Sequence, residues 1–363
     1  MVDRKAVQAA IEAIEDPELR RPITELGMLR ELEVARKGSV RAVIALPTPQ
    51  ASLREDLERQ VADAAKAIDG VGEVAVDFTV MTEEERDRLA ELLRGSSPAK
   101  VSGAGSRTRV IAVASGKGGV GKSSVTANLA VALAIEGHAV GVIDADVWGY
   151  SIPKMLGLDR PPTSFGQMII PSQIHGVRVI SMDFFVGPEQ AVVWRGPMLH
   201  KAVEQFLGDV FWDDPEFLLV DMPPGTGDVA ISLSQFLPRS QALIVTTPQI
   251  TAQRVAKRAA LMAQKVNQEV LGVVENMSWF TGDDGVRYSI FGSGGGQALA
   301  DDLGVPLLGQ VPLVTLLREA ADSGTPVAVV APDSEAAEAF GAIATKVVEL
   351  RPRVRTHPEL VIS

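Results

Sequence analysis

The stretch Gly116-Lys117-Gly118-Gly119-Val120-Gly121-Lys122-Ser123 decides how this chain folds. A glycine, four further residues and then Gly-Lys-Ser form the spacing of a phosphate-binding loop, or P-loop. An apolar run at residues 110–114 precedes the loop, and a helical pattern follows it to residue 135. A strand before and a helix after are the context that this motif requires. A plain glycine turn between strand and helix is the alternative, and it leaves the Lys-Ser pair unexplained.

The residue types of the loop suit a nucleotide. Glycines let backbone N–H groups turn inward around phosphate oxygens without a clash of Cβ atoms, and the start of the helix adds partial positive charge. We expect Lys122 to reach the β and γ phosphates and the Ser123 hydroxyl to bind Mg²⁺. The predicted binding residues here are Gly116, Lys117, Gly118, Gly119, Val120, Gly121, Lys122, Ser123 and Ser124.

Strands and helices alternate after the loop. Helical patterns separate most of the short apolar runs, which lie at residues 139–143, 177–181, 217–220, 242–246, 270–274 and 307–310. Near-continuous apolar strands of this kind are typical of a sheet that is covered on both faces. The region is therefore predicted to be an α/β domain with a doubly wound, mostly parallel sheet, whose last helix spans residues 335–350.

The composition of the chain changes before this region. Residues 95–107, GSSPAKVSGAGSR, have no hydrophobic period and are predicted to be a flexible linker. Residues 1–94 combine helical patterns near 7–14 and 51–68 with strand patterns at 29–34, 40–46 and 74–80, which predicts a small α+β domain. The P-loop domain is then expected at residues 108–350, followed by a frayed tail at 351–363.

Charge and composition exclude several classes of protein. The 363 residues carry 46 acidic and 35 basic side chains, a formal net charge of -11, which argues against general coating of nucleic acid. The sequence has neither a signal-like start nor an apolar stretch long enough to span a bilayer. We expect a cytoplasmic protein that binds neither nucleic acid nor membrane. Because the chain has no cysteine, its own thiolates can hold neither an iron–sulfur cluster nor zinc.

Three aspartates follow predicted strands. Asp144 and Asp146 come after the strand at 139–143, and Asp221 comes after the strand at 217–220. A carboxylate at the carboxyl end of a strand beside a phosphate loop suits the water shell of Mg²⁺, so Asp221 is predicted to be a metal residue. Each aspartate could instead cap the following helix, which is a common role at such positions.

Together, these motifs resemble the Mrp/Nbp/ApbC family of ATPases, which are iron–sulfur cluster carriers with the deviant P-loop of the MinD and ParA class. The matching segments are SGKGGVGKSSVTANLA, DADVWGYSIPKMLG, VVWRGPM, LLVDMPPGTGD, VTTPQ, ENMSWF and FGSGGGQALADDLGVPLLGQVPL. In addition, EDPELRRPITELGM resembles the small iron–sulfur-assembly domain that often precedes this ATPase. The resemblance implies a homodimer that hydrolyses ATP slowly with Mg²⁺, stimulated by a partner.

The resemblance also implies roles for single residues. Lys117 matches a lysine that crosses the dimer interface and contacts the partner's nucleotide, as an arginine finger does; a solvated surface lysine is the alternative. Asp146 is the candidate for orienting the attacking water, and Asp144 would support Mg²⁺ or the switch loop. Asn276 matches the position that recognises adenine, although an asparagine can also end a strand by bonding its own backbone.

One segment departs from the pattern of that family. Typical carriers have Cys-x-x-Cys between ENM-S and FGSGGG, and two subunits share a bridging cluster. Here residues 279–288 read WFTGDDGVRY, a polar turn whose hydroxyl and carboxylate groups are poor ligands for iron sulfide. The loop PTPQASL also has no cysteine, and the four histidines (His138, His175, His200 and His357) have no ligand spacing. A cluster is thus implied by the family, whereas its usual ligands are absent.

Three functions remain open on this evidence. The chain could be a cluster-carrier relative that serves apoprotein clients through a partner's cysteines or through its ATPase cycle alone. It could be a switch like ParA or MinD that regulates a protein partner, although the proline-containing tail argues against a membrane helix. It could also be a nucleotide-gated scaffold whose dimerisation matters and whose hydrolysis is incidental.

Overall fold

The computed structural model describes residues 2–35, 37–49, 51–96, 101, 106–146, 149, 151–185, 196–227, 230, 234, 237 and 240–350. The chain forms two compact units. The first comprises Met1–Pro98, Pro162–Pro171 and Asp209–Phe211, and the second comprises Ala99–Pro161, Ser172–Gly208 and Trp212–Ser363. The tail at 351–363 and most of the predicted linker, residues 97–100 and 102–105, lie outside the described residues.

The first unit is built on a three-stranded sheet in the order β1-β2-β3. β1 and β2 are antiparallel, and β2 and β3 are parallel. All three strands lie where the hydrophobic alternation predicts them. The elements of this unit are α1 (Arg4–Glu12), β1 (Leu29–Val34), β2 (Val40–Leu46), α2 (Ala51–Lys66), β3 (Val74–Val80), α3 (Glu83–Ser96), β6 (Thr163–Phe165) and β7 (Met168–Ile170).

The core of the first unit draws on distant parts of the sequence. Met168 and Ile170 of the β6–β7 hairpin, together with Phe211, join the buried cluster that α1, α2 and the sheet form around Ile11, Ile44 and others. Backbone hydrogen bonds between residues 169 and 209–211 hold these two segments side by side. Nothing in the local pattern of residues 162–171 predicts this placement.

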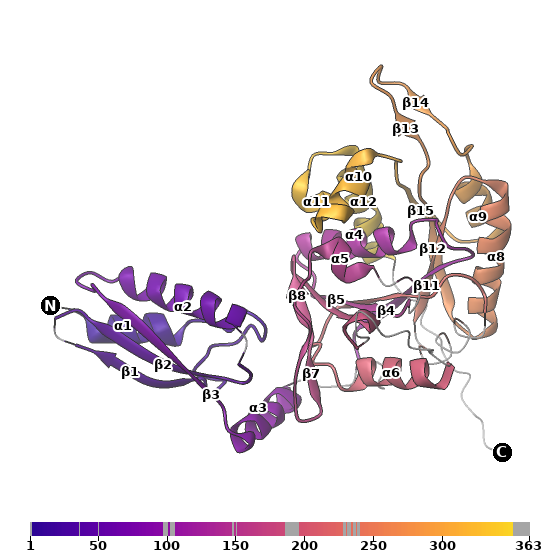
Figure 1. Cartoon of the computed structure of the whole chain (residues 1–363). Coiled ribbons are helices and arrows are strands. Elements are labelled where there is room, and N and C mark those ends of the chain that lie inside the picture. The colour runs from indigo at the N-terminus through magenta and orange to yellow at the C-terminus, as the bar shows by residue number, and fades with distance from the viewer. Residues whose placement is uncertain are drawn as a thin grey trace, which may run out of the picture. The chain divides into compact units, whose positions relative to one another are not determined.

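The second unit contains an eight-stranded sheet in the order β15-β12-β11-β4-β10-β5-β9-β8 (Figure 1). Every neighbouring pair is parallel except β8–β9 at one edge. This arrangement confirms the predicted fold class. The strands of this unit are β4 (Arg109–Ser115), β5 (Val140–Asp144), β8 (Ser172–Ile174), β9 (Val177–Ser181), β10 (Phe217–Asp221), β11 (Gln241–Thr246), β12 (Glu269–Glu275), β13 (Phe280–Thr281), β14 (Arg287–Tyr288) and β15 (Leu307–Gln310).

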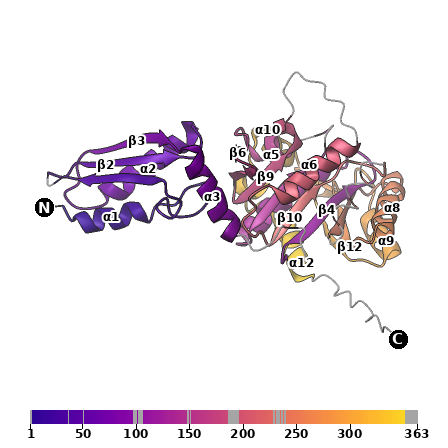
Figure 2. The same cartoon turned by 90° about the horizontal axis from the view of Figure 1, so that it is seen from below.

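Helices cover both faces of this sheet because the side chains of each strand alternate between them. Leu243 and Val245 of β11 join the core beneath α4 and α12, whereas Ala242 and Ile244 pack with α8 and α9. Figures 1 and 2 show α6 on the side away from α12. The helices are α4 (Lys122–Ile135), α5 (Ile152–Leu156), the 3₁₀ turn η1 (Met182–Phe185), α6 (Gly196–Gly208), α8 (Ile250–Lys265), α9 (Gly295–Leu303), α10 (Thr315–Ser323), α11 (Val327–Val330) and α12 (Glu335–Glu349).

The order of the strands brings the predicted site together. β10 lies between β4 and β5, and its last residue, Asp221, is in register with Val113 of β4 and Asp144 of β5. The phosphate loop and these aspartates therefore meet at the carboxyl edge of the sheet, where open α/β sheets bind ligands. Across the described ranges, no helix combines the length and the apolar character needed to cross a membrane.

Candidate nucleotide-binding site

The phosphate loop has the backbone shape of a cradle. Gly119 and Gly121 have φ of +78° and +79°, a region that favours glycine. A Cβ atom built on Gly118 or Gly119 meets no described atom within 4 Å, so there is open space beside both glycines. α4 starts directly after Gly121, its N-cap residue, which has no side chain to cap the first turn. The free N–H groups and the positive end of α4 suit an anion.

Asn276 braces the loop from the end of β12. Its side-chain amide donates to the backbone carbonyl of Val120 at 3.0 Å. A Cβ atom on Gly121 would lie 2.2 Å from Nδ2 of Asn276, so this approach requires glycine at position 121. Asn276 is 6% exposed. The contact does not test the predicted recognition of adenine, which stays a prediction.

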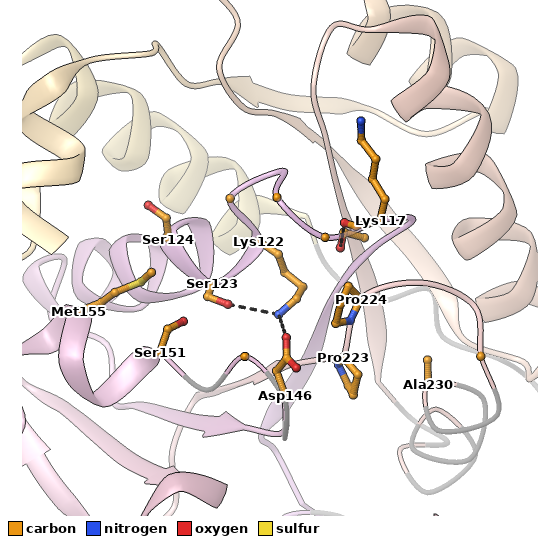
Figure 3. Close-up of a pocket in the computed structure, with 16 residues that line it drawn as sticks. Lys117, Lys122, Ser123, Ser124, Asp146, Ser151, Met155, Pro223, Pro224 and Ala230 are labelled. Atoms are coloured by element: carbon orange, nitrogen blue, oxygen red, sulfur yellow. Dashed lines mark hydrogen bonds and ion pairs between the residues drawn. The ribbon is translucent and has the colours of Figure 1, made fainter. Parts of the chain in front are cut away.

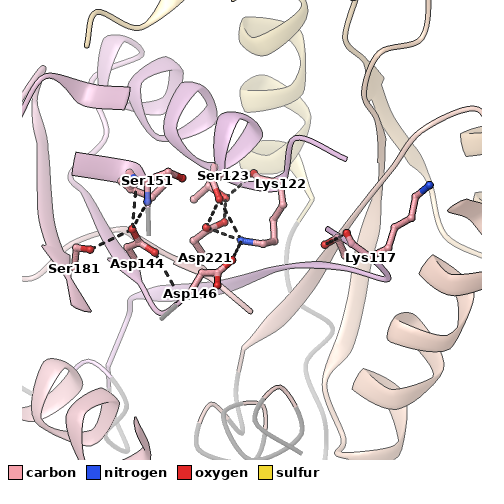
Figure 4. Close-up of polar contacts among 11 residues, drawn as sticks. Lys117, Lys122, Ser123, Asp144, Asp146, Ser151, Ser181 and Asp221 are labelled. Atoms are coloured by element: carbon pink, nitrogen blue, oxygen red, sulfur yellow. Dashed lines mark hydrogen bonds and ion pairs between the residues drawn. The ribbon is translucent and has the colours of Figure 1, made fainter. Parts of the chain in front are cut away.

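Lys122 and Ser123 converge on Asp221 beneath the loop (Figure 4). The Lys122 ammonium donates to Oδ2 of Asp221 at 2.6 Å, and the Ser123 hydroxyl donates to the same oxygen at 2.6 Å. The hydroxyl of Thr126 donates to Oδ1 of Asp221 at 2.7 Å. Asp221 is fully buried, and a buried carboxylate is costly unless it is paired and hydrogen-bonded. These three donors compensate its charge.

Asp146 faces Lys122 from the other side. Its carboxylate lies 3.7 Å from the ammonium and is almost buried. The predicted pair of Lys122 and Asp146 is thus brought together.

Asp144 lies deeper than Asp146, and its contacts match the capping alternative. Its carboxylate accepts from the backbone N–H groups of Ser151 and Ile152 at the start of α5, at 3.1 and 3.2 Å, and from the hydroxyl of Ser181 at 3.1 Å. Burial raises the pKa of Asp144 to about 7; the charge of Asp221 adds to this effect and that of Lys122 opposes it. A role of Asp144 at the metal stays a prediction.

A cavity of about 620 Å³ opens above these groups (Figure 3). One wall consists of the phosphate loop, and the others come from the loop after β5 and the loop after β10. The lining residues are Ser115, Lys117, Gly118, Gly119, Gly121, Lys122, Ser123, Ser124, Asp146, Gly149, Ser151, Met155, Pro223, Pro224, Gly227 and Ala230. Most of the predicted loop residues therefore face one cavity of a size that suits a small-molecule cofactor.

Lys117 is the loop residue that does not join the cluster. Its ammonium extends away from Lys122 and Asp146 (Figure 4) and lies 3.4 Å from the side-chain oxygen of Gln249, next to the first turn of α8. The hydroxyl of Ser115 donates to the backbone carbonyl of Lys117 at 3.0 Å. The side chain therefore points outward from a loop whose backbone is fixed.

The residues present fit a nucleoside triphosphate with Mg²⁺. The open loop and the uncapped helix supply N–H donors for phosphate, and Lys122 supplies a cation. The Ser123 hydroxyl and the Asp221 carboxylate, which already share a contact, are hard oxygen groups that suit Mg²⁺ or its bound waters. When bound, Mg²⁺ would neutralise charge on the transferring phosphate.

The described residues do not fit an iron–sulfur cluster. Among them, no group of three or more His, Cys, Asp and Glu side chains could hold a metal ion. The segment where related carriers have cysteines forms β13 and β14, whose turn is closed by its own hydrogen bonds: Asp284 accepts from the Val286 N–H at 3.0 Å and from the Tyr288 hydroxyl at 2.7 Å. The polar turn expected there is thus the tip of a β-hairpin.

Comparison with known proteins decides the family. The model of ParA-type NUBPL iron-transfer P-loop NTPases matches residues 106–348, which is most of the chain. The chain belongs to this family of iron-transfer P-loop NTPases. The model of an iron-sulfur cluster assembly protein matches residues 4–76 of the same P-loop NTPase. The resemblance found in the sequence motifs is therefore confirmed.

Whole-chain relatives agree with this family. The chain is 46% identical over 348 residues to an iron-sulfur cluster carrier protein of Mycobacterium tuberculosis, covering 93% of this chain and 91% of the relative. It is 42% identical over 354 residues to a carrier protein of the same description in Synechocystis, covering 96% and 97%. The family is thus shown over both units of this P-loop NTPase.

Solved structures agree with the fold of the P-loop NTPase. A nucleotide-binding protein in complex with ADP from Archaeoglobus fulgidus is 36% identical, with a TM-score of 0.54, covering 60% of this chain and 86% of that one. The cell division ATPase MinD of Pyrococcus furiosus is 27% identical, with a TM-score of 0.53, covering 67% and 99%.

Several residues of the site were missed in the sequence. Thr126 lies four residues after Lys122, hence on the same face of α4, and this spacing could have indicated its contact with Asp221. Ser181 is the last residue of β9, and Gln249 directly precedes α8, so both lie far from their contact partners in the sequence. Only the strand order brings Ser181 to Asp144 and Gln249 to Lys117, so no local signal marks either residue.

Proposed function

We propose that this P-loop NTPase binds ATP with Mg²⁺ and hydrolyses it as a homodimer, in the service of iron–sulfur cluster transfer to apoprotein clients. The carrying observation is the cluster at the loop: Lys122 and Ser123 both contact Asp221, and Asp146 lies 3.7 Å from Lys122. Phosphoryl transfer requires a cation at the phosphates, ligands for Mg²⁺ and a carboxylate that orients the attacking water. In this proposal Lys122 is the cation, Ser123 and Asp221 hold Mg²⁺, and Asp146 orients the water.

The outward direction of Lys117 supports the dimer. Within its own chain this ammonium contacts Gln249 and points away from Lys122 and Asp146. A second copy facing the carboxyl edge could receive it beside the terminal phosphate, where an added cation stabilises charge in the transition state. Asp146 would then orient the attacking water, and Asn276 would contact the adenine.

Turnover by two variants tests the enzyme. We expect Lys117→Ala to lower kcat on the order of 10³-fold, with a smaller change in KM, as removal of a trans-acting arginine does. Lys117→Arg keeps the charge and should retain much of the rate. Asp146→Asn should abolish most turnover while the protein still binds ATP in calorimetry. Unchanged turnover in a folded Lys117→Ala protein would refute the role of that lysine.

The cargo is predicted to be held by a partner's cysteines. The chain has no cysteine, and the hairpin at residues 280–288 has no soft ligand. Anaerobic reconstitution of the purified protein with iron and sulfide should therefore leave no stoichiometric cluster in its visible absorption spectrum. A stable cluster on the isolated chain would contradict this proposal.

The lack of cysteine also favours a second candidate function. In this alternative, the chain is a nucleotide-dependent dimerisation switch, like ParA or MinD, that regulates a protein partner without any cluster. Capture of partners with the Asp146→Asn variant in ATP separates the two functions. A captured protein that carries an iron–sulfur chromophore or its cysteine ligands supports transfer, and a partner with neither supports the switch.

A further inference from the structure

Another cavity, of about 800 Å³, lies in the first unit between α1 and β1. We call it the edge groove. The consecutive residues 29–35 line it on one side, and Arg4, Gln8 and Glu12, each about one helical turn from the next, line it on the side of α1. Successive side chains of a strand point to opposite faces of its sheet. A cavity that touches all of residues 29–35 therefore runs along the backbone edge of β1.

The backbone of β1 is open to pairing along this edge. β1 is the outer strand of its sheet (Figure 1), and within the described part of the first unit it pairs with β2 alone. The N–H of Ala35 donates toward β2, to the carbonyl of Ser39 at 2.8 Å. Because the backbone groups of alternate residues point to opposite sides of a strand, Leu32 and Val34 direct their N–H and C=O groups into the edge groove. Such an edge is a template for pairing with another chain.

The side chains of β1 give its two faces different chemistry. Leu32 and Val34 are half-buried and pack against the core that this unit forms with α1 and α2. Glu31 and Glu33 are exposed on the opposite face of the sheet. A strand added beside β1 would therefore have apolar neighbours on one face and acidic neighbours on the other.

The arginine next to these glutamates is already engaged. Arg41 of β2 lies opposite Glu33, but its guanidinium donates to Asp77 of β3 at 2.7 Å. This hydrogen bond and the charges of Asp77, Glu33 and Glu31 raise the pKa of Arg41, while partial desolvation opposes them. Three acidic side chains thus surround one arginine, and the exposed face attracts a further cation at the free edge of β1.

The two arginines of the edge groove leave this acidic face uncompensated. Arg30 is ion-paired with Glu85 of α3 at 2.6 Å. Arg4 belongs to α1, which packs on the core face of the sheet together with Leu32 and Val34. Neither arginine is therefore the partner of the exposed glutamates.

The same glutamates disfavour pairing of β1 with a second copy of itself. A twofold axis through the sheet makes the two strands antiparallel. With the axis at Leu32, Glu31 of each copy lies opposite Glu33 of the other; with the axis at either glutamate, that residue lies opposite itself. Like charges directly opposite each other destabilise a sheet. The edge thus suits a strand of opposite charge.

We propose that the edge groove binds an extended segment of a partner protein in which basic and apolar residues alternate, and that this segment adds to the sheet as a fourth strand beside β1. Its basic side chains lie next to Glu31 and Glu33, and its apolar side chains lie next to Leu32 and Val34. Cross-strand pairs of both kinds stabilise a sheet. The six residues of β1 span about 20 Å, the reach of an equally short segment. This docking goes beyond the proposed function, because it involves no nucleotide.

The test measures binding of synthetic peptides to the full chain by fluorescence anisotropy. The probe is Gly-Lys-Val-Lys-Val-Lys-Gly, labelled with fluorescein at its amino terminus and amidated at its carboxyl terminus. Gly-Lys-Lys-Lys-Val-Val-Gly has the same composition without the alternation and measures attraction by charge alone. Two further versions of the probe carry N-methyl groups on either the valines or the lysines, because only alternate residues of an added strand turn their N–H groups toward β1.

We expect the probe to bind at least about tenfold more tightly than the peptide without alternation, the effect of a few good cross-strand pairs. One of the two N-methylated peptides should keep this affinity and the other should lose it. Hydrogen exchange at residues 29–35 should slow when the probe is bound, because Leu32 and Val34 then donate to it.

An exchange of charge separates recognition from loss of fold. Glu31→Lys combined with Glu33→Lys should weaken binding of the probe about tenfold and should create binding of the acidic peptide Gly-Glu-Val-Glu-Val-Glu-Gly. Glu55→Lys combined with Glu58→Lys is the matched control, because both glutamates are exposed on α2 and lie outside the lining of the edge groove. The control variant should bind the probe as the unmodified chain does.

Several results overturn the inference. One is the lack of saturable binding of the probe at concentrations up to about 1 mM. Others are equal affinity for the two unmethylated peptides, and binding of both or of neither N-methylated peptide. A charge-exchanged chain that still binds the probe normally, or a control variant that loses it to the same extent, also overturns the inference.

Discussion

The contact between Asn276 and the phosphate loop makes a measurable prediction about two glycines. Gly119 and Gly121 share a left-handed backbone, with φ of +78° and +79°. Alanine at either position costs about 1–2 kcal/mol for that conformation. Only at Gly121 does the new Cβ meet a neighbour, the Asn276 amide at 2.2 Å. Moving this amide breaks its hydrogen bond to Val120, a net loss of about 1 kcal/mol.

We therefore expect Gly121→Ala to lower the free energy of unfolding of the second unit by about 2–3 kcal/mol, and Gly119→Ala by about 1–2 kcal/mol. Urea unfolding followed by tryptophan fluorescence reports on this unit. The reason is that both tryptophans that the structure describes, Trp212 and Trp279, belong to it.

A double-mutant cycle supplies the control. In an Asn276→Ala background the neighbouring amide is gone, so the cost of Gly121→Ala should fall to that of Gly119→Ala. Equal costs for the two glycine substitutions in the unmodified chain, or strictly additive effects of Gly121→Ala and Asn276→Ala, would refute the idea that this amide braces the loop.

Three further predictions concern buried or paired polar groups. Thr126→Val removes a donor from buried Asp221 and should lower the unfolding free energy of the second unit by about 1–3 kcal/mol in the same urea assay. Burial raises the pKa of Asp16 despite hydrogen bonds from the backbone, so the stability of the first unit should fall as pH rises from the ordinary pKa through the raised one; calorimetry should show that Asp16→Asn removes this fall. Partial burial raises the pKa of Glu335, but its hydrogen bonds and the charge of its arginine partner outweigh this effect and leave the pKa lowered. The β13–β14 hairpin, in which Trp279, Thr281 and Arg287 donate to Glu335, should accordingly loosen as pH falls through that lowered pKa, seen as a shift of Trp279 emission that is absent in Glu335→Gln.

Much of the site follows from the sequence because its parts are local. The glycine spacing, the lysine and the serine lie within eight residues, and the aspartates directly follow apolar strands. Periodicity likewise predicts the strands and the parallel sheet. The fully buried position of Asp221 and its in-register match to Asp144 then follow from the strand order, which the βαβ alternation alone leaves undetermined.

Other features depend on contacts that no local pattern encodes. The sequence predicts only a polar turn at the β13–β14 hairpin because each of its strands has two residues, too few for a period-2 signal. Its polar contacts with α12 are made by Glu335, which lies 48 to 56 residues after the side chains that it binds. The outward direction of Lys117 depends on Gln249 in the same way. Long-range polar contacts of this kind are invisible to reasoning from a window of sequence.

The discontinuous core of the first unit has a consequence for synthesis on the ribosome. Met168, Ile170 and Phe211 complete the cluster that residues 2–93 begin. A nascent chain that has reached only Pro98 therefore exposes apolar surface that later residues must cover. At 5–20 residues per second, roughly 6–23 s separate residue 98 from residue 211. The core of the first unit, most of which lies in the first 98 residues, is therefore complete only after the middle of the chain has been synthesised.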